Sequence, residues 1–184
     1  LHFGIPSFKL DRDVMATRHE ILKGMGVAFE LGVEIGRDVG LDRLLDDYDA
    51  TIARLIADID AARERVHLLY YLMFDDAVGA ALADALARAA GRGVRCRVLL
   101  DAVGAKRGYR RFAAPLRAAG VEVHRMMPGG LRWRRSGRMD LRNHRKIAVI
   151  DNVVGFVGSQ NLASATFVPG HPNRELVARA RGPI

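Results

Sequence analysis

The stretch TIARLIADIDAARERVHLLYYLMFDDAVGAALADALARAAGRGVRCRVLLD, residues 51–101, decides the fold class. Its first part carries apolar residues at helical spacing from Ile52 to Ala62, and the run VHLLYYLMF that follows is typical of a buried strand. A second helical stretch ends in glycine and leads into VRCRVLLD, which again has strand character. A strand, a crossover helix and another strand at these spacings predict parallel strands joined by a right-handed connection, and therefore an α/β protein.

The same alternation continues toward the carboxyl end. A third helix is expected from Tyr109 to Ala119, and it leads through Gly120 into the strand VEVHRM. Two further strands, KIAVID and VGFVG, are joined by a short turn at Asn152 and Val153, and ELVARA is the last strand candidate. We therefore expect an α/β fold with a mixed, largely parallel sheet flanked by helices on both faces.

Composition narrows the class of protein. The 184 residues are 49% hydrophobic and 27% charged, which is typical of a globular domain and excludes disordered and fibrous classes. The single cysteine, Cys96, cannot form an internal disulfide or a zinc site, and its strand context predicts a buried, unreactive thiol. The longest apolar run, residues 67–74, is far shorter than the roughly 20 residues that span a bilayer, so we expect no transmembrane helix and no signal peptide.

The net charge of +8 is concentrated in one segment. Residues 1–124 contain 18 basic and 18 acidic side chains, whereas residues 125–146 contain 8 basic side chains and one acidic one. The basic residues of this segment are Arg125, Arg132, Arg134, Arg135, Arg138, Arg142, Arg145 and Lys146. Such a segment attracts phosphate groups or an anionic membrane surface, although a solvated loop would have the same composition.

The segment leads directly into RNHRKIAVIDNVVGFVGSQN, residues 142–161. His144 and Lys146 are two positions apart, so on a strand their side chains project from one face and can converge on one phosphate. Imidazole can attack phosphorus or protonate a leaving oxygen, and an ammonium stabilises the negative charge of the transition state. Ser159 and Asn161 follow the next strand, where a hydroxyl and an amide could contact phosphate oxygens.

At these residues the chain resembles the phospholipase D superfamily, whose signature is H-x-K-x4-D followed by G-S/G-x-N. From about residue 48 to 184 it is similar to the first catalytic half of bacterial cardiolipin synthases. The resemblance implies that His144 is the nucleophile, forming a phosphohistidine, or its acid/base counterpart. It implies no metal and no cofactor. The other site residues that it implies are Lys146, Asn161, Ser159 and Arg142 for the phosphate, Asp151 for holding the loop around the site, and Glu175 for orienting the imidazole.

Two departures from that family bear on the partners. Its active site is built from two such motifs, so the second catalytic half would come from a homodimer or from a C-terminal half outside this sequence. Its amino-terminal membrane helices are absent here, so peripheral binding to the cytoplasmic side of a bacterial inner membrane would depend on the arginine-rich segment and on Trp133. The implied substrate is a phospholipid similar to phosphatidylglycerol.

Residues 1–48 have a different character. LDRDVMATRHEILKGMG predicts a helix that begins near Asp11, and VAFELGVEIG predicts a strand or hairpin. The segment resembles an internal stretch of the glutamate synthase small subunit, but it contains no G-x-G-x-x-G fingerprint, so no flavin or NADPH site is expected. We expect a chimeric chain joined between residues 41 and 51, or a diverged amino terminus.

Three functions follow as hypotheses. The first is a phospholipase D-type phosphatidyltransferase or phosphodiesterase half-site of cardiolipin synthase type. The second is a catalytically silent half-domain that binds anionic lipid. The third is a dimeric nuclease, since basic segments also suit a nucleic-acid backbone.

Overall fold

The computed structural model describes residues 12–24, 47–127, 142–167 and 175–183. The chain divides into two compact units, Leu1–Gly40 and Leu41–Ile184. In the first unit, helix α1 spans Arg12–Gly24, where the sequence predicts a helix. The strand or hairpin expected for VAFELGVEIG lies outside the described residues.

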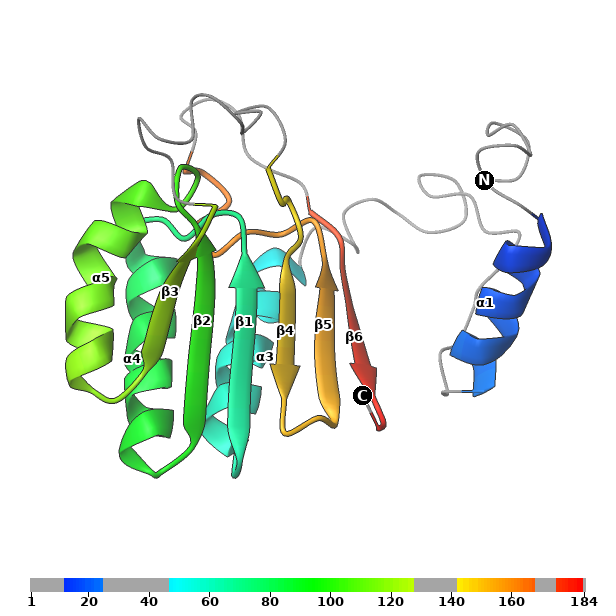
Figure 1. Cartoon of the computed structure of the whole chain (residues 1–184), viewed down its shortest axis with the longest axis horizontal. Coiled ribbons are helices and arrows are strands. Elements are labelled where there is room, and N and C mark those ends of the chain that lie inside the picture. The colour runs from blue at the N-terminus through cyan, green and yellow to red at the C-terminus, as the bar shows by residue number, and fades with distance from the viewer. Residues whose placement is uncertain (1–11, 25–46, 128–141, 168–174, 184) are drawn as a thin grey trace. The chain divides into compact units, whose positions relative to one another are not determined.

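The second unit contains a six-stranded sheet and three described helices (Figure 1). In chain order the elements are α3 (Asp47–Ala61), β1 (Arg65–Tyr70), α4 (Ala77–Gly91), β2 (Arg95–Asp101), α5 (Lys106–Ala118), β3 (Glu122–Met126), β4 (Ile147–Ile150), β5 (Val154–Gly158) and β6 (Val177–Arg181). The strand order is β3-β2-β1-β4-β5-β6. The α/β class is therefore confirmed.

The sheet is mixed, but it is less parallel than the sequence suggests. β1, β2 and β3 run parallel, as the helical crossovers between them require. β4, β5 and β6 each pair antiparallel with the preceding strand in the sheet order. Three of the five described strand pairings are thus antiparallel, so the sheet is mixed but not largely parallel. The three-residue turn between β4 and β5, residues 151–153, is one cause, because so short a turn joins antiparallel neighbours.

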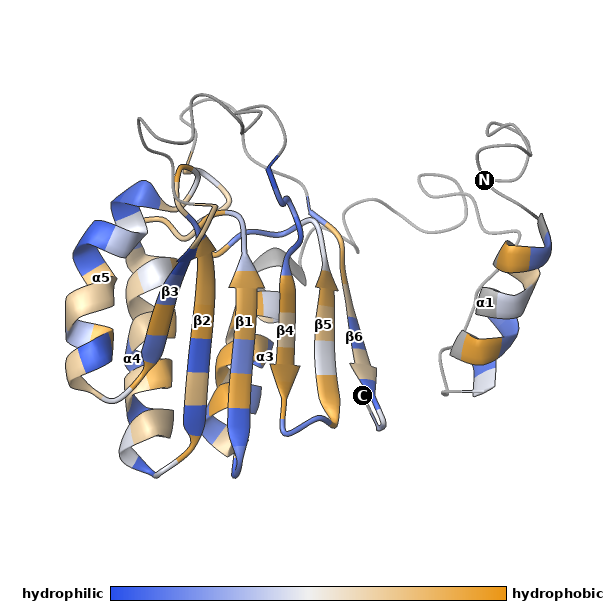
Figure 2. Ribbon diagram, in the orientation of Figure 1, coloured by the Kyte–Doolittle hydropathy of each residue, from blue (hydrophilic) through white to orange (hydrophobic). Residues whose placement is uncertain are grey.

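The core lies on one face of this sheet. Side chains of β1 alternate between buried and half-buried, and those of β2 alternate between exposed and buried up to Leu100. Figure 2 shows hydrophilic and hydrophobic residues alternating in the first half of these strands and hydrophobic residues in succession after it. The buried set packs against α3, α4 and α5, with Leu55, Ile59, Leu82, Leu86 and Leu116 almost fully buried. Cys96 belongs to this buried face, and burial raises the pKa of its thiol to about 11, as expected for an unreactive cysteine.

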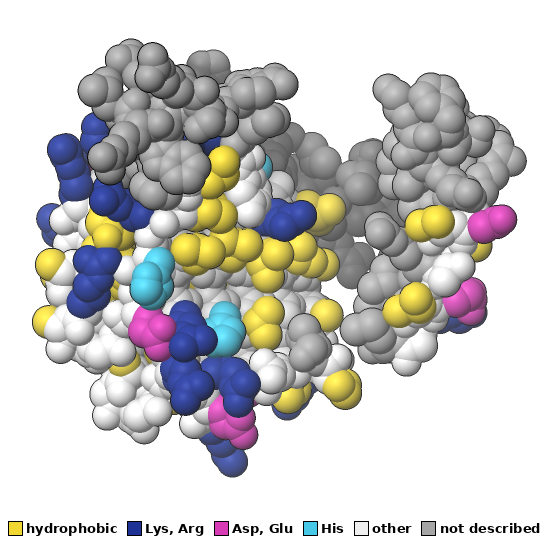
Figure 3. Space-filling model, viewed as in Figure 1, with side chains coloured by type: hydrophobic (Ala, Val, Ile, Leu, Met, Phe, Trp, Pro, Cys, Tyr) yellow, Lys and Arg dark blue, Asp and Glu magenta, His cyan; other side chains and the backbone are white. Residues whose placement is uncertain are grey.

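The other face of the sheet carries no helix of the second unit within the described ranges, so the expected second helical layer is not seen there. Figure 3 shows hydrophobic side chains gathered across this face, with basic and histidine side chains beside them. A shallow groove there is lined by Leu69, Leu99, Ile147 and Val149, among others. His67 lines it too; burial, with help from Arg97 and Arg65, lowers the pKa of its ring.

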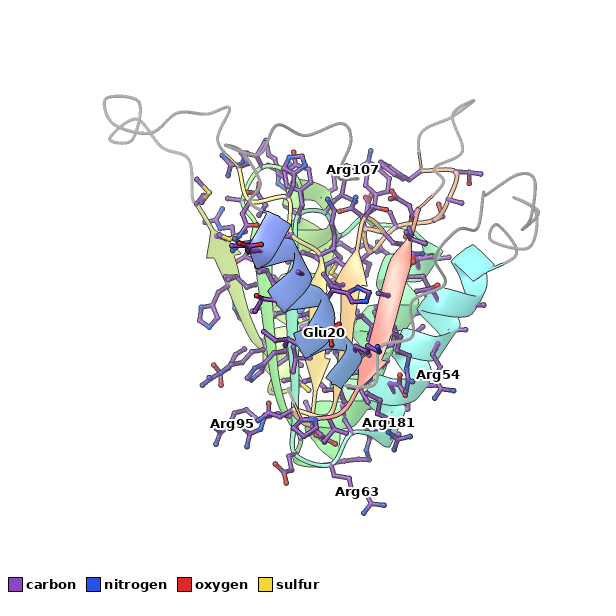
Figure 4. All side chains as sticks on the ribbon, turned by 90° about the vertical axis from the view of Figure 1, so that its right-hand side faces the viewer. Glu20, Arg54, Arg63, Arg95, Arg107 and Arg181 are labelled. Carbon is purple, nitrogen blue, oxygen red and sulfur yellow. The ribbon has the colours of Figure 1, made fainter. Side chains whose placement is uncertain are left out.

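Asp151 fixes the end of the sheet that lies away from His144. Its backbone has a positive φ of 53°, and its carboxylate accepts hydrogen bonds at 2.9 Å from the backbone N–H groups of Arg63, Glu64 and Arg65. Figure 4 labels Arg63 at one end of the sheet and Arg107 at the other. Since β4 is extended, the seven positions from His144 to Asp151 span on the order of 20 Å. Asp151 therefore holds the connection between α3 and β1, and the expectation that it holds the loop around the site is wrong.

We expect Asp151→Ala to lower the free energy of unfolding by about 2 kcal/mol, because three backbone donors lose their acceptor and alanine disfavours a positive φ. Burial alone would raise the pKa of Asp151, but the bonds from Arg65, Arg63 and Glu64 outweigh it and lower that pKa. The contribution of the carboxylate is therefore present above the ordinary carboxyl pKa and is lost as the pH falls through the lowered value. Urea unfolding at neutral and acidic pH measures both effects.

The matched control is Asp84→Ala on the exposed face of α4, where we expect a change of no more than about 0.5 kcal/mol. Equal stability of the Asp151→Ala and Asp84→Ala proteins would contradict this role of Asp151.

Candidate functional site

The predicted site residues, Asp151 excepted, gather at one edge of the sheet. The parallel strands β1 and β2 end there at Tyr70 and Asp101, and the antiparallel strand β4 begins there, because Ile147 pairs with Leu69. The end of β5 and the start of β6 lie at the same edge, since Gly158 pairs with Val177. Carboxyl ends of parallel strands are where α/β proteins place their ligands.

His144 and Lys146 lie just before β4 and not on a strand, so the alternation of strand side chains does not bring them together. Their common neighbour is Tyr71, which directly follows β1. The imidazole of His144 stacks on the Tyr71 ring with a centroid distance of 3.9 Å and an interplanar angle of 23°. The Nζ atom of Lys146 lies 5.7 Å from the centroid of the same ring and donates a hydrogen bond of 2.7 Å to the His144 carbonyl.

Lys146 carries a half-buried amino group whose charged form is disfavoured by burial. Burial lowers the pKa of Lys146, and the carboxylate of Glu175 opposes this effect. Among the described residues Lys146 forms no salt bridge, so its charge is not neutralised by a direct partner. A half-buried ammonium of this kind is suited to hold an anionic group.

Ser159 connects the end of β5 to the segment that carries Glu175. Its hydroxyl accepts a hydrogen bond of 2.9 Å from the Leu176 backbone N–H, and its own backbone N–H donates to the Leu176 carbonyl at 2.9 Å. The hydroxyl is thus used by the fold, which brings Glu175 close enough to Lys146 to act on its charge. Within the described residues Glu175 makes no hydrogen bond to His144, so the orienting contact that we expected is not seen.

Asn161 keeps hydrogen-bonding capacity that the fold does not use. Its side-chain Oδ1 is buried and has no partner in the described part of the chain. The next residue, Leu162, is fixed by a backbone hydrogen bond from its N–H to the Leu72 carbonyl and by another from the Phe74 N–H to its own carbonyl. These bonds hold Asn161 beside the segment that carries Tyr71.

Arg142 has a different partner from the one expected. Its Nε atom lies 2.9 Å from both carboxylate oxygens of Asp101, and its NH2 group donates to the Met127 carbonyl at 2.8 Å. The side chain of Asp101 is fully buried and that of Arg142 is 9% exposed. The guanidinium is therefore engaged in an internal ion pair instead of facing a substrate phosphate.

Sequence reasoning did not identify Tyr71 or Asp101. The signal for Asp101 is a carboxylate at the end of a buried strand, immediately before a glycine-containing turn. Tyr71 gives no such signal, because the neighbouring Tyr70 is an equally aromatic residue that is buried in the core.

The remaining expectations have these outcomes. Trp133 and the arginines at 132, 134, 135 and 138 lie outside the described residues. In the described ranges no group of three or more His, Cys, Asp or Glu side chains is arranged to hold a metal ion. Nor does any described helix have the length and apolar character needed to cross a membrane.

A mixed α/β sheet with His144 and Lys146 at the edge where its parallel strands end defines a phospholipase D-like domain. Residues 55–183 match the family described as "Cardiolipin synthase, PLD-like domain". This chain belongs to that family.

Curated relatives agree with this family. Cardiolipin synthase A of Yersinia pseudotuberculosis serotype O:1b (strain IP 31758) is 35% identical over 147 residues, which are 77% of this chain and 30% of the relative. Cardiolipin synthase A of Yersinia pestis bv. Antiqua (strain Angola) gives the same values. The chain therefore spans 30% of the length of these relatives.

Among solved structures, NucT from Helicobacter pylori is similar in fold, with a TM-score of 0.51 and 20% identity. The similarity covers 74% of this chain and 80% of that chain. Residues 1–54 lie outside the family match, so the resemblance of residues 1–48 to glutamate synthase, the expected junction and the chimeric origin stay predictions.

Proposed function

We propose that residues 49–184 form one catalytic half of a phosphatidyltransferase of cardiolipin synthase type. One imidazole nitrogen of His144 attacks the phosphorus of a phosphatidylglycerol-like lipid, and the bond from phosphorus to the leaving glycerol oxygen breaks. An acceptor alcohol then attacks the phosphohistidine, its proton passes to the imidazole that protonated the leaving glycerol, and the imidazole of His144 is released. The observation that supports this role is the exposed imidazole of His144, stacked on Tyr71 next to the half-buried ammonium of Lys146.

The other site residues support this chemistry in different ways. Lys146 supplies positive charge where the transition state gathers negative charge, and the side-chain N–H₂ group of Asn161 donates a further hydrogen bond to a phosphate oxygen. Ser159 acts indirectly, by fixing the segment of Glu175 beside Lys146. Arg142 stabilises the chain next to the site through Asp101, and Asp151 stabilises the opposite end of the sheet.

The partners follow from the same proposal. In-line displacement requires a second imidazole to protonate the leaving glycerol oxygen, and a homodimer or another catalytic half would supply it. The basic segment 125–146 would bring the domain to an anionic membrane surface, which we propose to be the cytoplasmic side of a bacterial inner membrane.

An activated substrate tests the nucleophile without the second half. A p-nitrophenyl phosphodiester releases a stable anion, so its leaving group needs no proton donor. We expect a burst of p-nitrophenolate of up to one equivalent per chain and an acid-labile phosphoryl adduct on the peptide that contains His144. No adduct, or an adduct on another residue, would overturn the proposal. A DNA substrate processed faster than phosphatidylglycerol would favour the nuclease hypothesis instead.

Lys146→Met is expected to slow the burst by about 10²- to 10³-fold, because the transition state loses a charge that no other described side chain replaces at the site. Stopped-flow measurement of p-nitrophenolate gives the rate. The matched control, Lys106→Met at the exposed start of α5, should react like the unchanged chain.

The lowered pKa of Lys146 adds a pH dependence. The ammonium is lost at a lower pH than that of an ordinary lysine, so the rate should fall on the alkaline side earlier than an ordinary lysine would allow. Lys146→Arg, which stays charged, should move this fall to higher pH. If the rate of the Lys146→Arg protein falls at the same alkaline pH as that of the unchanged chain, Lys146 is not the group that causes the fall.

A further inference from the structure

We propose that Tyr71 is a positioning residue for His144, and that Gly104 and Asp101 form the support that holds Tyr71 in place. This inference rests on the proposed function, because it assigns a role in presenting the nucleophile. The family signature does not include these three residues, which lie 40 to 73 positions away from His144.

The first step concerns the ring contact. His144 is exposed and makes no hydrogen bond through its ring within the described residues, so the stack on Tyr71 is the contact that restricts its side-chain torsions. An interplanar angle of 23° at 3.9 Å between centroids places the two rings almost face to face. Lys146 lies near the same ring, so Tyr71 sets the position of the nucleophile relative to the ammonium.

The second step concerns what lies against Tyr71. A Cβ atom placed on Gly104 would come within 2.7 Å of Tyr71 Cζ, 2.9 Å of Cε1 and 2.6 Å of the Tyr71 carbonyl oxygen. Any larger residue at position 104 would therefore displace the tyrosine. Glycine is required here for space, so that the turn after β2 can pack directly against Tyr71.

The third step concerns how this turn is fixed. The Oδ1 atom of Asp101 accepts hydrogen bonds of 2.9 Å from the backbone N–H groups of Val103 and Gly104. The same carboxylate binds Arg142, which precedes His144 by two residues. One buried carboxylate therefore fixes both the turn that packs against Tyr71 and the chain that leads into His144.

Together these contacts hold the nucleophile from two sides. The ring of His144 is held by Tyr71, and its backbone is held through Arg142 and Asp101. A histidine presented in this way needs less reorganisation to reach phosphorus than a freely rotating one. Tyr71 should thus affect the rate of the chemical step more than the binding of substrate.

The test combines a spectroscopic and a kinetic measurement on the full chain. In ¹H–¹³C spectra, the His144 ring signals are assigned by their loss in His144→Ala, and stacking on Tyr71 should shift them upfield. Tyr71→Leu and Gly104→Ala should return these signals toward the positions of free histidine, whereas Tyr71→Phe should keep them upfield. The matched control is Gly91→Ala, because a Cβ atom there meets nothing within 4 Å.

With the p-nitrophenyl phosphodiester, Tyr71→Leu and Gly104→Ala should lower the rate constant of the burst by about 10- to 100-fold with little change in the half-saturating concentration. Tyr71→Phe and Gly91→Ala should react like the unchanged chain. Urea unfolding of each variant shows whether the fold is retained.

Each result decides the inference. The inference would be overturned if the His144 signals have the same positions in Tyr71→Leu as in the unchanged chain, because the stack would then be absent in solution. The inference would also be overturned if the His144 signals of Tyr71→Leu move toward those of free histidine, the burst of Tyr71→Leu is unchanged and His144→Ala is inactive. The stack would then have no role in the reaction. A burst that persists in His144→Ala would overturn the proposed function itself, and the positioning role with it.

Discussion

Replacing His144 by alanine is expected to lower the turnover of any phosphodiester by about 10⁴-fold or more, because the variant lacks the nitrogen that bonds to phosphorus. The fold should be unaffected, since the His144 side chain is exposed and contributes no atom to the core. Burst amplitude and urea unfolding, measured on the same preparation, separate chemistry from stability.

The control for this change is His124→Ala. His124 is also an exposed histidine, but it lies on β3 and faces the open side of the sheet. The His124→Ala substitution should leave the burst unchanged. A full burst from His144→Ala would contradict the assignment of the nucleophile, and loss of the burst in both variants would show that the effect is not specific to His144.

Local sequence patterns predicted most elements of the second unit. The runs that became β1, β2 and β3 are apolar stretches bounded by polar or glycine residues, and the helices between them have clear helical periodicity. Strand direction was harder to predict, because it depends on how the chain returns to the sheet. The long segment between β3 and β4 gives no local signal of that return, and β4 enters antiparallel to β1.

The candidate site was predicted less completely, because its contacts join residues that are distant in sequence. The motif places His144, Lys146 and Asp151 close together along the chain, yet an extended strand separates Asp151 from the other two. The buried partner of Arg142 is 41 positions away, and charge alone could not reveal it. Tyr71 was missed for the same reason, since its contact with His144 crosses from the end of β1 to the start of β4.

The second large effect concerns the second imidazole that the proposed reaction requires. The sequence contains one H-x-K motif, and a single imidazole cannot both attack phosphorus and protonate the oxygen that leaves from the opposite side. We therefore expect a monomer to release p-nitrophenolate from the activated diester but almost no glycerol from phosphatidylglycerol. The two substrates differ in whether the leaving group needs a proton. The ratio of the rates with the two substrates therefore reports whether a second histidine takes part.

If phosphatidylglycerol does react, the activity should belong to a pair of chains that place two His144 side chains across one phosphate. The rate per chain should then rise with protein concentration below the dimer dissociation constant, with the dimer population followed by light scattering. An equal mixture with His144→Ala chains should retain about a quarter of the activity, instead of about a half, because mixed dimers have one imidazole. Full glycerol release from a species that stays monomeric would contradict the shared site, since one chain would then supply both the nucleophile and the proton donor.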